Sequence, residues 1–300
     1  MSSHPPHPAS PEVAAFHDPR TGSVQYVVSD PATHRCAIID PVLDFDPASG
    51  SIGTDSADAL LRHIEMAGLS LQWILDTHPH ADHFSAADYL RRRSGAATAT
   101  GARTTEVRSL WRDLYNLPAL GEEAPWSRLF EDGDCFQIGE MPVRVMLTPG
   151  HTLASVTFVA GDAAFVHDTL FMPDSGTARA DFPGGDAAAL WHSIGRILAL
   201  PDSTRLFTGH DYCPNGRPPA WESRVAQQRA ENIHLQAARD EAAFVRLRQE
   251  RDRSLPIPRL MLAALQVNLC GGRLPPPEAN GRRYLKLPLE AFPEAPWEAA

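Results

Sequence analysis

Residues 77–83 read Thr-His-Pro-His-Ala-Asp-His, so three histidines and one aspartate fall within six positions. The preceding residues, Leu71–Asp76, form an apolar run typical of a buried strand, which places the motif on the loop at the end of that strand. Imidazole nitrogens and carboxylate oxygens bind zinc, iron and manganese, and so many of them close together would repel and desolvate one another without a cation. The motif therefore predicts a metal site.

The same pattern, an apolar run that ends in a lone histidine or aspartate, occurs at three later places in the chain. Residues 143–150 precede His151, residues 163–167 precede Asp168, and residues 205–209 precede His210. Sheets often carry functional side chains on the loops at the ends of their strands. We therefore expect these three residues to join the first motif in one metal site.

This ordered set of motifs, HxHxDH, PGHT, a later aspartate and GHDY, resembles that of the metallo-β-lactamase superfamily from about Ser23 to about Tyr212. The resemblance implies an α+β fold, in which two mixed β-sheets face each other, helices flank them, and the metals lie in a groove along one edge. It assigns one metal position to His78, His80 and His151, a second to Asp82, His83 and His210, and the bridge between them to Asp168. A lone HxH pair is weak evidence, whereas the full ordered set is specific for a metal site.

Within that superfamily, four segments resemble the persulfide dioxygenase family. They are residues 39–43 (IDPVL), 77–83 (THPHADH), 176–182 (GTARADF) and 209–212 (GHDY). Members of the family use one Fe(II) ion and O2 to oxidise glutathione persulfide to sulfite and glutathione in sulfide detoxification. The resemblance implies that His78, His151 and Asp168 hold the iron, and such a set leaves positions open for a thiolate and O2.

The resemblance also implies roles in substrate binding and catalysis. It places Arg179 against the glutathione part of the substrate, where a guanidinium can pair with a carboxylate. It places Tyr212 near the iron, as a substrate-binding and catalytic residue, and Asp82 is the second catalytic candidate. The alternatives are an ion pair with Asp181 for Arg179 and a core position for Tyr212. Two more residues separate Asp168 from Arg179 than in the family pattern, which favours a bacterial subgroup and leaves the substrate contacts open.

The main alternative is a glyoxalase II-like hydrolase of glutathione thioesters. It would bind two ions of zinc, iron or manganese across all seven ligand positions and use a bridging hydroxide as its nucleophile. The ligands alone do not separate the two enzymes, and one zinc ion could also replace the iron. Residues 39–43 and the sequence Gly-His-Asp-Tyr at 209–212 favour the dioxygenase, because Gly-His-Glu-Tyr is expected in a glyoxalase II. A non-catalytic scaffold is disfavoured, since no ligand position is damaged.

Composition favours a cytoplasmic protein that binds neither nucleic acid nor an anionic membrane. The 300-residue chain has a net charge of −10 and no basic stripe, which argues against nucleic acid and anionic membranes as partners. Its four cysteines show no CxxC spacing, which fits a reducing compartment, and no apolar run is long enough to cross a bilayer. The family resemblance implies glutathione persulfide and O2 as partners, and a homodimer is a further possibility.

Periodicity divides the chain into three parts. Residues 1–18 are rich in Pro, His and Ser and are expected to be a flexible lead-in, and residues 19–220 are expected to form the catalytic domain. In that domain the patterns predict hairpins over 24–39, 136–147 and 155–166 and helices over 57–67 and 86–93. Residues 221–300 are expected to pack on the same domain as one or two helices over 221–253 and a Pro-rich tail.

Overall fold

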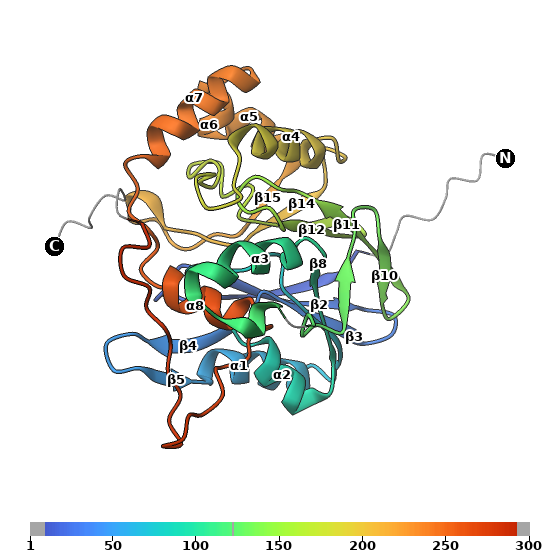
Figure 1. Cartoon of the computed structure of the whole chain (residues 1–300). Coiled ribbons are helices and arrows are strands. Elements are labelled where there is room, and N and C mark those ends of the chain that lie inside the picture. The colour runs from blue at the N-terminus through green and yellow to red at the C-terminus, as the bar shows by residue number, and fades with distance from the viewer. Residues whose placement is uncertain (1–9, 122, 293–300) are drawn as a thin grey trace.

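Two six-stranded sheets face each other in the computed structural model, which describes residues 10–121 and 123–292 (Figure 1). The first sheet has the order β1 (Glu12–His17), β2 (Val24–Asp30), β3 (Arg35–Ile39), β6 (Ser70–Leu75), β8 (Ala97–Gly101) and β9 (Arg128–Phe130). The second has the order β10 (Cys135–Ile138), β11 (Met141–Leu147), β12 (Val156–Ala160), β13 (Ala163–His167), β14 (Arg205–Thr208) and β15 (Glu222–Arg224). A small third sheet consists of β5 (Ser51–Gly53), β4 (Val42–Asp46) and β7 (Phe84–Ser85). Each large sheet contains antiparallel and parallel pairs, so both are mixed.

An apolar cluster fills the space between the two large sheets. Tyr26 on β2 packs edge-on against Phe165 on β13 and Phe207 on β14, with ring centroids 5.4 and 5.5 Å apart. The residues of β11 alternate between buried and exposed over most of its length, as expected of a strand with one face on a core. Burial of these aromatic side chains contributes much of the free energy that holds the two sheets together.

Helices cover the outer face of each sheet. The first sheet is covered by α1 (Asp55–Met66), α2 (Ala87–Ser94) and α8 (Met261–Asn268), and α3 (Thr104–Tyr115) packs beside α8. The second is covered by α4 (Ala187–Leu198), α5 (Val225–Glu231), α6 (Ile233–Ala237) and α7 (Glu241–Asp252). Two short 3-10 helices, Pro118–Gly121 and Pro214–Gly216, complete the secondary structure. The layers are therefore helix, sheet, sheet and helix, and the predicted fold class is confirmed.

The predicted hairpins and the first two predicted helices are confirmed. The strands β2 and β3, β10 and β11, and β12 and β13 pair antiparallel. The helices expected over 57–67 and 86–93 are α1 and α2. Local periodicity was sufficient for these elements because each presents a continuous apolar face to a core.

The N-terminal prediction was wrong for residues 12–17, which form β1 and pair antiparallel with β2. Val13 and Ala15 pack against the cluster between the sheets, whereas Ala14 and Phe16 pack against the cluster under the outer helices. A strand with apolar contacts on both faces lacks the alternating pattern of a half-buried strand. Residues 1–9 of the predicted lead-in lie outside the described residues.

The region 221–253 contains three helices rather than the one or two predicted. The side chain of Asn232 accepts hydrogen bonds from the backbone N–H groups of His234 and Leu235 and so caps the start of α6. The side chain of Asp240 caps α7 by accepting from the N–H of Ala243. Asn and Asp favour such caps because their side chains compete with the helical backbone, so they interrupt this segment without Gly or Pro.

The tail after α7 packs on the same domain. Ala264 and Val267 of α8 are fully buried in the cluster under the first sheet. The side-chain amide of Gln266 donates to the carbonyl of Lys286 and accepts from its N–H, over 2.6 and 2.8 Å. Met261, Ala264 and Leu265 of α8 are buried, and residues 293–300 lie outside the described part. Between residues 10 and 292, leaving out residue 122, no helix combines the length and apolarity needed to cross a membrane.

We expect Gly150→Ala to destabilise the fold. Gly150 has a φ of +137°, and a Cβ atom there would lie 2.3 Å from the backbone N and Cα of Leu190 on α4. Because neither backbone can move freely, the substitution should lower the free energy of unfolding by about 2–3 kcal/mol. At Gly195, on the same helix, nothing lies within 4 Å of the position that a Cβ atom would take, so Gly195→Ala should raise that free energy by about 0.5–1 kcal/mol. Urea titration measures both, and a Gly150→Ala variant as stable as the parent would contradict the contact.

Candidate metal centre

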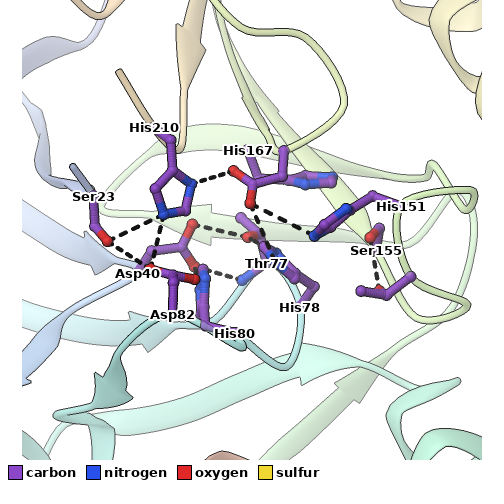
Figure 2. A network of polar contacts seen from close by, with 12 residues as sticks. Ser23, Asp40, Thr77, His78, His80, Asp82, His151, Ser155, His167 and His210 are labelled. Carbon is purple, nitrogen blue, oxygen red and sulfur yellow. Dashed lines mark hydrogen bonds and ion pairs between the residues drawn. The ribbon is translucent and has the colours of Figure 1, made fainter. Parts of the chain in front are cut away.

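The seven predicted ligand residues lie together where several strands end. His78, His80, Asp82 and His83 are on the loop after β6, His151 follows β11, Asp168 follows β13 directly, and His210 follows β14. Figure 2 shows the labelled members of this set pointing toward one another from different strands. The sheets therefore bring together residues that are up to 132 positions apart in the sequence, from His78 to His210 (210 − 78 = 132).

His78, His151 and Asp168 form a set that fits one metal ion. Nε2 of His78 lies 3.8 Å, and Nε2 of His151 lies 3.6 Å, from Oδ2 of Asp168. One ligand atom from each residue lies within 4.8 Å of the other two. Nε2 of His78 is buried and has no hydrogen-bond partner among the described residues, which is costly for a polar atom. A cation bound between the three side chains would satisfy it.

Neighbouring groups turn the imidazole rings of this set toward Asp168. Asp40 accepts hydrogen bonds from the backbone N and the hydroxyl of Thr77, over 2.7 and 2.8 Å. Because the single hydroxyl proton of Thr77 goes to Asp40, its oxygen is left to accept from Nδ1 of His78, 3.0 Å away. Nδ1 of His151 donates to the carbonyl of Arg179 over 2.9 Å. Both rings therefore keep an unprotonated Nε2 for a cation.

The other predicted ligands mainly contact one another. Oδ2 of Asp82 lies 2.8 Å from both Nδ1 of His83 and Nε2 of His210. Nδ1 of His210 lies 2.6 Å from Oδ1 of Asp168, so His210 bridges the two carboxylates. Asp82, Asp168 and His210 also offer ligand atoms within 4.8 Å of one another. Nε2 of His80 lies 3.0 Å from Oδ1 of Asp40, so this ring pairs with a carboxylate outside the predicted set.

Burial and charge set different protonation states for these residues. Burial lowers the pKa of His151 and, together with neighbouring imidazoles, lowers the pKa of His78 well below the usual range. Burial opposes ionisation of Asp168, but the nearby His210 outweighs it and lowers the pKa of Asp168 to about 2. Burial also opposes protonation of His80, but Asp40 outweighs it and raises the pKa of His80 to about 9. At neutral pH the first set therefore offers two neutral imidazoles and one carboxylate, as a divalent cation requires.

A cavity of about 990 Å³ opens from the site, and His151, Asp168 and His210 form part of its wall. Tyr212 also lines this cavity and is 62% exposed. Its ring stacks on that of His210, with centroids 5.7 Å apart and an angle of 8° between the planes. The alternative of a core tyrosine is therefore wrong, and the catalytic and substrate-binding roles of Tyr212 stay predictions.

Arg179 lines the same cavity but is already paired. Its guanidinium donates to both carboxylate oxygens of Asp181, over 2.7 and 2.8 Å, and to the carbonyl of Pro256 over 2.6 Å. The ion pair that was the alternative for Arg179 is thus present, and its contact with substrate stays a prediction. Arg251 and Arg259 also line the cavity, and no carboxylate of the described residues lies within 4.0 Å of either guanidinium.

Several residues that support the site were missed by the sequence analysis. Asp40 lies in the segment 39–43 but received no role from the sequence, although it fixes Thr77 and pairs with His80. On α7, the buried Arg248 donates to the carbonyl of Thr177 over 3.0 Å, and Asp252 accepts from the N–H of Ala180 over 2.9 Å. These contacts hold the segment whose Arg179 carbonyl orients His151. The i,i+4 spacing of Arg and Asp was visible in the sequence, but the distant segment that they contact was not.

Comparison with known proteins agrees with this geometry at the level of the superfamily. The family model of the metallo-beta-lactamase superfamily matches residues 18–210. A beta-lactamase hydrolase-like protein of Xylella fastidiosa is 64% identical over 96% of this chain and 67% of its own length. Glyoxylase B2 of Dictyostelium discoideum is 40% identical over 93% of this chain and 97% of its own length.

Two further relatives relate to the predicted persulfide dioxygenase family. The mitochondrial persulfide dioxygenase ETHE1 of Bos taurus is 30% identical over 86% of this chain and 88% of its own length. The crystal structure of ETHE1 from Myxococcus xanthus matches with a TM-score of 0.71 and 27% identity, over 87% of this chain and 100% of that chain. The persulfide dioxygenases are thus distant relatives, while relatives with higher identity carry hydrolase or glyoxylase names. The fold, the convergence of the ligand residues and the match over residues 18–210 agree, and the chain belongs to the metallo-β-lactamase superfamily.

Proposed function

We propose that this protein is a persulfide dioxygenase that binds one Fe(II) ion through His78, His151 and Asp168. The supporting observation is that His78, His151 and Asp168 converge where Nε2 of His78 is buried without a hydrogen-bond partner among the described residues. Nε2 of His80 and Nε2 of His83 are also without such a partner, but Nε2 of His80 lies 3.0 Å from Oδ1 of Asp40, which is outside this set. Two imidazoles and one carboxylate on one face are typical of non-heme Fe(II) oxygenases.

The proposed reaction converts glutathione persulfide, O2 and water into glutathione, sulfite and two protons. Iron(II) bound at this set would supply open coordination positions for the persulfide sulfur and O2 and the electrons for the first step of O2 reduction. The protein holds the two rings through Thr77 and the Arg179 carbonyl, so that no ring rotation is needed when the ion binds. The exposed phenol of Tyr212 can donate a hydrogen bond to the reacting sulfur or oxygen atoms.

The cavity supports a substrate of the size and charge of glutathione persulfide. Its volume of about 990 Å³ is at the upper end for small-molecule sites and can hold a tripeptide. Phe171 and Phe182 give part of its wall an apolar surface, which helps to exclude competing water. Arg251 and Arg259 bring positive charge to the same cavity without a carboxylate partner among the described residues, and glutathione carries two carboxylates.

A glyoxalase II-like hydrolase of glutathione thioesters is the second candidate. Asp82, Asp168 and His210 offer a second set of ligand atoms within 4.8 Å of one another, and Asp168 belongs to both sets. Two cations could therefore share Asp168 and activate a water molecule between them. The identity of 40% to a glyoxylase favours this candidate, whereas the resemblance of residues 39–43 and 209–212 to the persulfide dioxygenases favours the first.

Oxygen consumption tests the proposed reaction. Protein loaded anaerobically with one Fe(II) per chain should consume O2 when glutathione persulfide is added, and sulfite should form in equal amount. The same protein loaded with Zn(II) is the control and should consume none, because zinc has no redox chemistry. Iron-loaded protein that consumes no O2 but hydrolyses a glutathione thioester would support the hydrolase instead.

Two substitutions separate one metal from two. His151→Ala removes a ligand of the first set, so iron content and turnover should both fall to background while the circular dichroism spectrum is unchanged. Asp82→Ala should keep about one iron per chain and lose only about 10–100-fold in turnover, as expected for a residue outside the coordination sphere. His192→Ala, a change at an exposed histidine of α4, is the control. If the parent protein binds two metal ions per chain and Asp82→Ala binds only one, the one-metal site would be contradicted.

Arg179 can be tested by comparing it with its ion-pair partner. If Arg179 binds a substrate carboxylate, Arg179→Ala should raise KM about tenfold or more, because a charge-assisted hydrogen bond is lost. Asp181→Ala would free the guanidinium from its competitor and should lower KM or leave it unchanged. Steady-state kinetics with glutathione persulfide measures both. An increase of KM in both variants would show that the ion pair between Arg179 and Asp181 only stabilises the loop and that Arg179 does not bind the substrate.

A further inference from the structure

The helix α8 contacts the metal-ligand loop, although it lies beyond residues 18–210 that match the superfamily. Asn268, the last residue of α8, is 3% exposed. Its side-chain amide nitrogen donates to the carbonyls of His80 and His83, both over 2.8 Å. Its side-chain oxygen accepts from the backbone N–H of Ser85 over 2.7 Å. Both amide protons and the carbonyl oxygen of the Asn268 side chain thus form hydrogen bonds with the backbone of residues 80–85.

These hydrogen bonds fix the part of the loop that lies between ligand residues. The carbonyls of His80 and His83 flank Asp82, and the same loop begins with His78. A buried carbonyl oxygen needs a hydrogen-bond donor. For the carbonyl oxygens of His80 and His83, no backbone N–H of the loop acts as that donor, so the donor is the side chain of Asn268. Asn268 therefore supplies hydrogen bonds to this backbone that the loop does not supply itself.

The end of α8 is held tightly against this loop. A Cβ atom on Gly272, just after the helix, would lie 2.7 Å from the carbonyl oxygen of Ser85 and 3.1 Å from the N of Asp88. Val267 and Leu269, on either side of Asn268, are fully buried in two different apolar clusters. The amide of Asn268 thus reaches the loop from a rigid support rather than from a mobile tail.

We propose that Asn268 is a positioning residue of the metal centre, which holds the backbone of residues 80–85 so that the side chains of this loop face the metal. The proposal rests on the metal site described above, and it applies equally to a dioxygenase and a hydrolase. It also gives a role to the C-terminal extension, which completes the site through its helix α8.

Gln266 provides a matched control on the same helix. It is also 3% exposed, and its amide likewise joins α8 to a distant segment through the carbonyl and N–H of Lys286. Its hydrogen bonds do not reach residues 77–85. Gln266→Ala should therefore cost folding stability without affecting the metal centre.

The test is metal binding, without any measurement of turnover. Co(II) is titrated into metal-free protein in competition with a chelator, and the visible spectrum of bound Co(II) reports its coordination. Asn268→Ala and the isosteric Asn268→Asp, which replaces the two donors by an acceptor, should weaken Co(II) binding about 10–100-fold and change the spectrum. Gln266→Ala should leave affinity within about twofold and the spectrum unchanged, although its Tm falls.

Unchanged affinity and spectrum in a folded Asn268 variant would overturn the proposal, as would an equal loss in Gln266→Ala. Wild-type protein that binds no Co(II) would overturn both this proposal and the proposed function. If neither Asn268 variant folds, hydrogen exchange of the wild-type protein decides. Because coupling is reciprocal, Co(II) should then slow exchange in residues 261–269 as well as in 77–85. Protection confined to the loop would contradict the proposal.

Discussion

The carboxylate of Asp168 is the group on which the geometry of the site depends. One of its oxygens contacts His210, and the other faces His78 and His151. The parallel pairing of β13 with β14 brings the ends of these two strands side by side, and Gly209 leaves the space that the carboxylate needs. A Cβ atom at Gly209 would lie 2.5 Å from Oδ1 of Asp168. A buried carboxylate is tolerated only when such partners surround it, so the strand order of the second sheet and the chemistry of the site are linked.

The layered fold and the grouping of the predicted ligand residues could be predicted from the sequence because both leave local signals. The motif at 77–83 carries its ligands within six positions, and each of the later ligands ends an apolar strand. The contacts that orient these ligands leave no such signal. Asp40 orients His78 through the hydroxyl of Thr77, and Arg179 orients His151 through its backbone carbonyl. Asn268 contacts the loop through backbone carbonyls nearly 190 positions away in the sequence. Tertiary structure alone brings such groups together.

Arg179 illustrates a different limit of the sequence. Residues two positions apart in extended chain point to the same side, so an ion pair with Asp181 was foreseeable and was one of two alternatives. What the sequence could not show is that carbonyls of the segment after α7 accept the remaining protons of the guanidinium. The helices of the extension thus influence both sides of the site: α7 through the segment that carries Arg179, and α8 through the loop that carries His78. All seven predicted ligand residues lie within the matched residues 18–210, whereas these supports lie outside the family match.

The contact between Asn268 and the ligand loop also affects when the site can form. A ribosome synthesises the loop at residues 77–85 long before α8, and N-terminal parts of a chain can begin to fold during synthesis. The backbone of the loop acquires its last three hydrogen bonds only after residue 268 has left the exit tunnel. Any cation captured earlier would meet a loop that still samples several conformations. The finished site thus forms only after α8 has been synthesised and has packed on the loop.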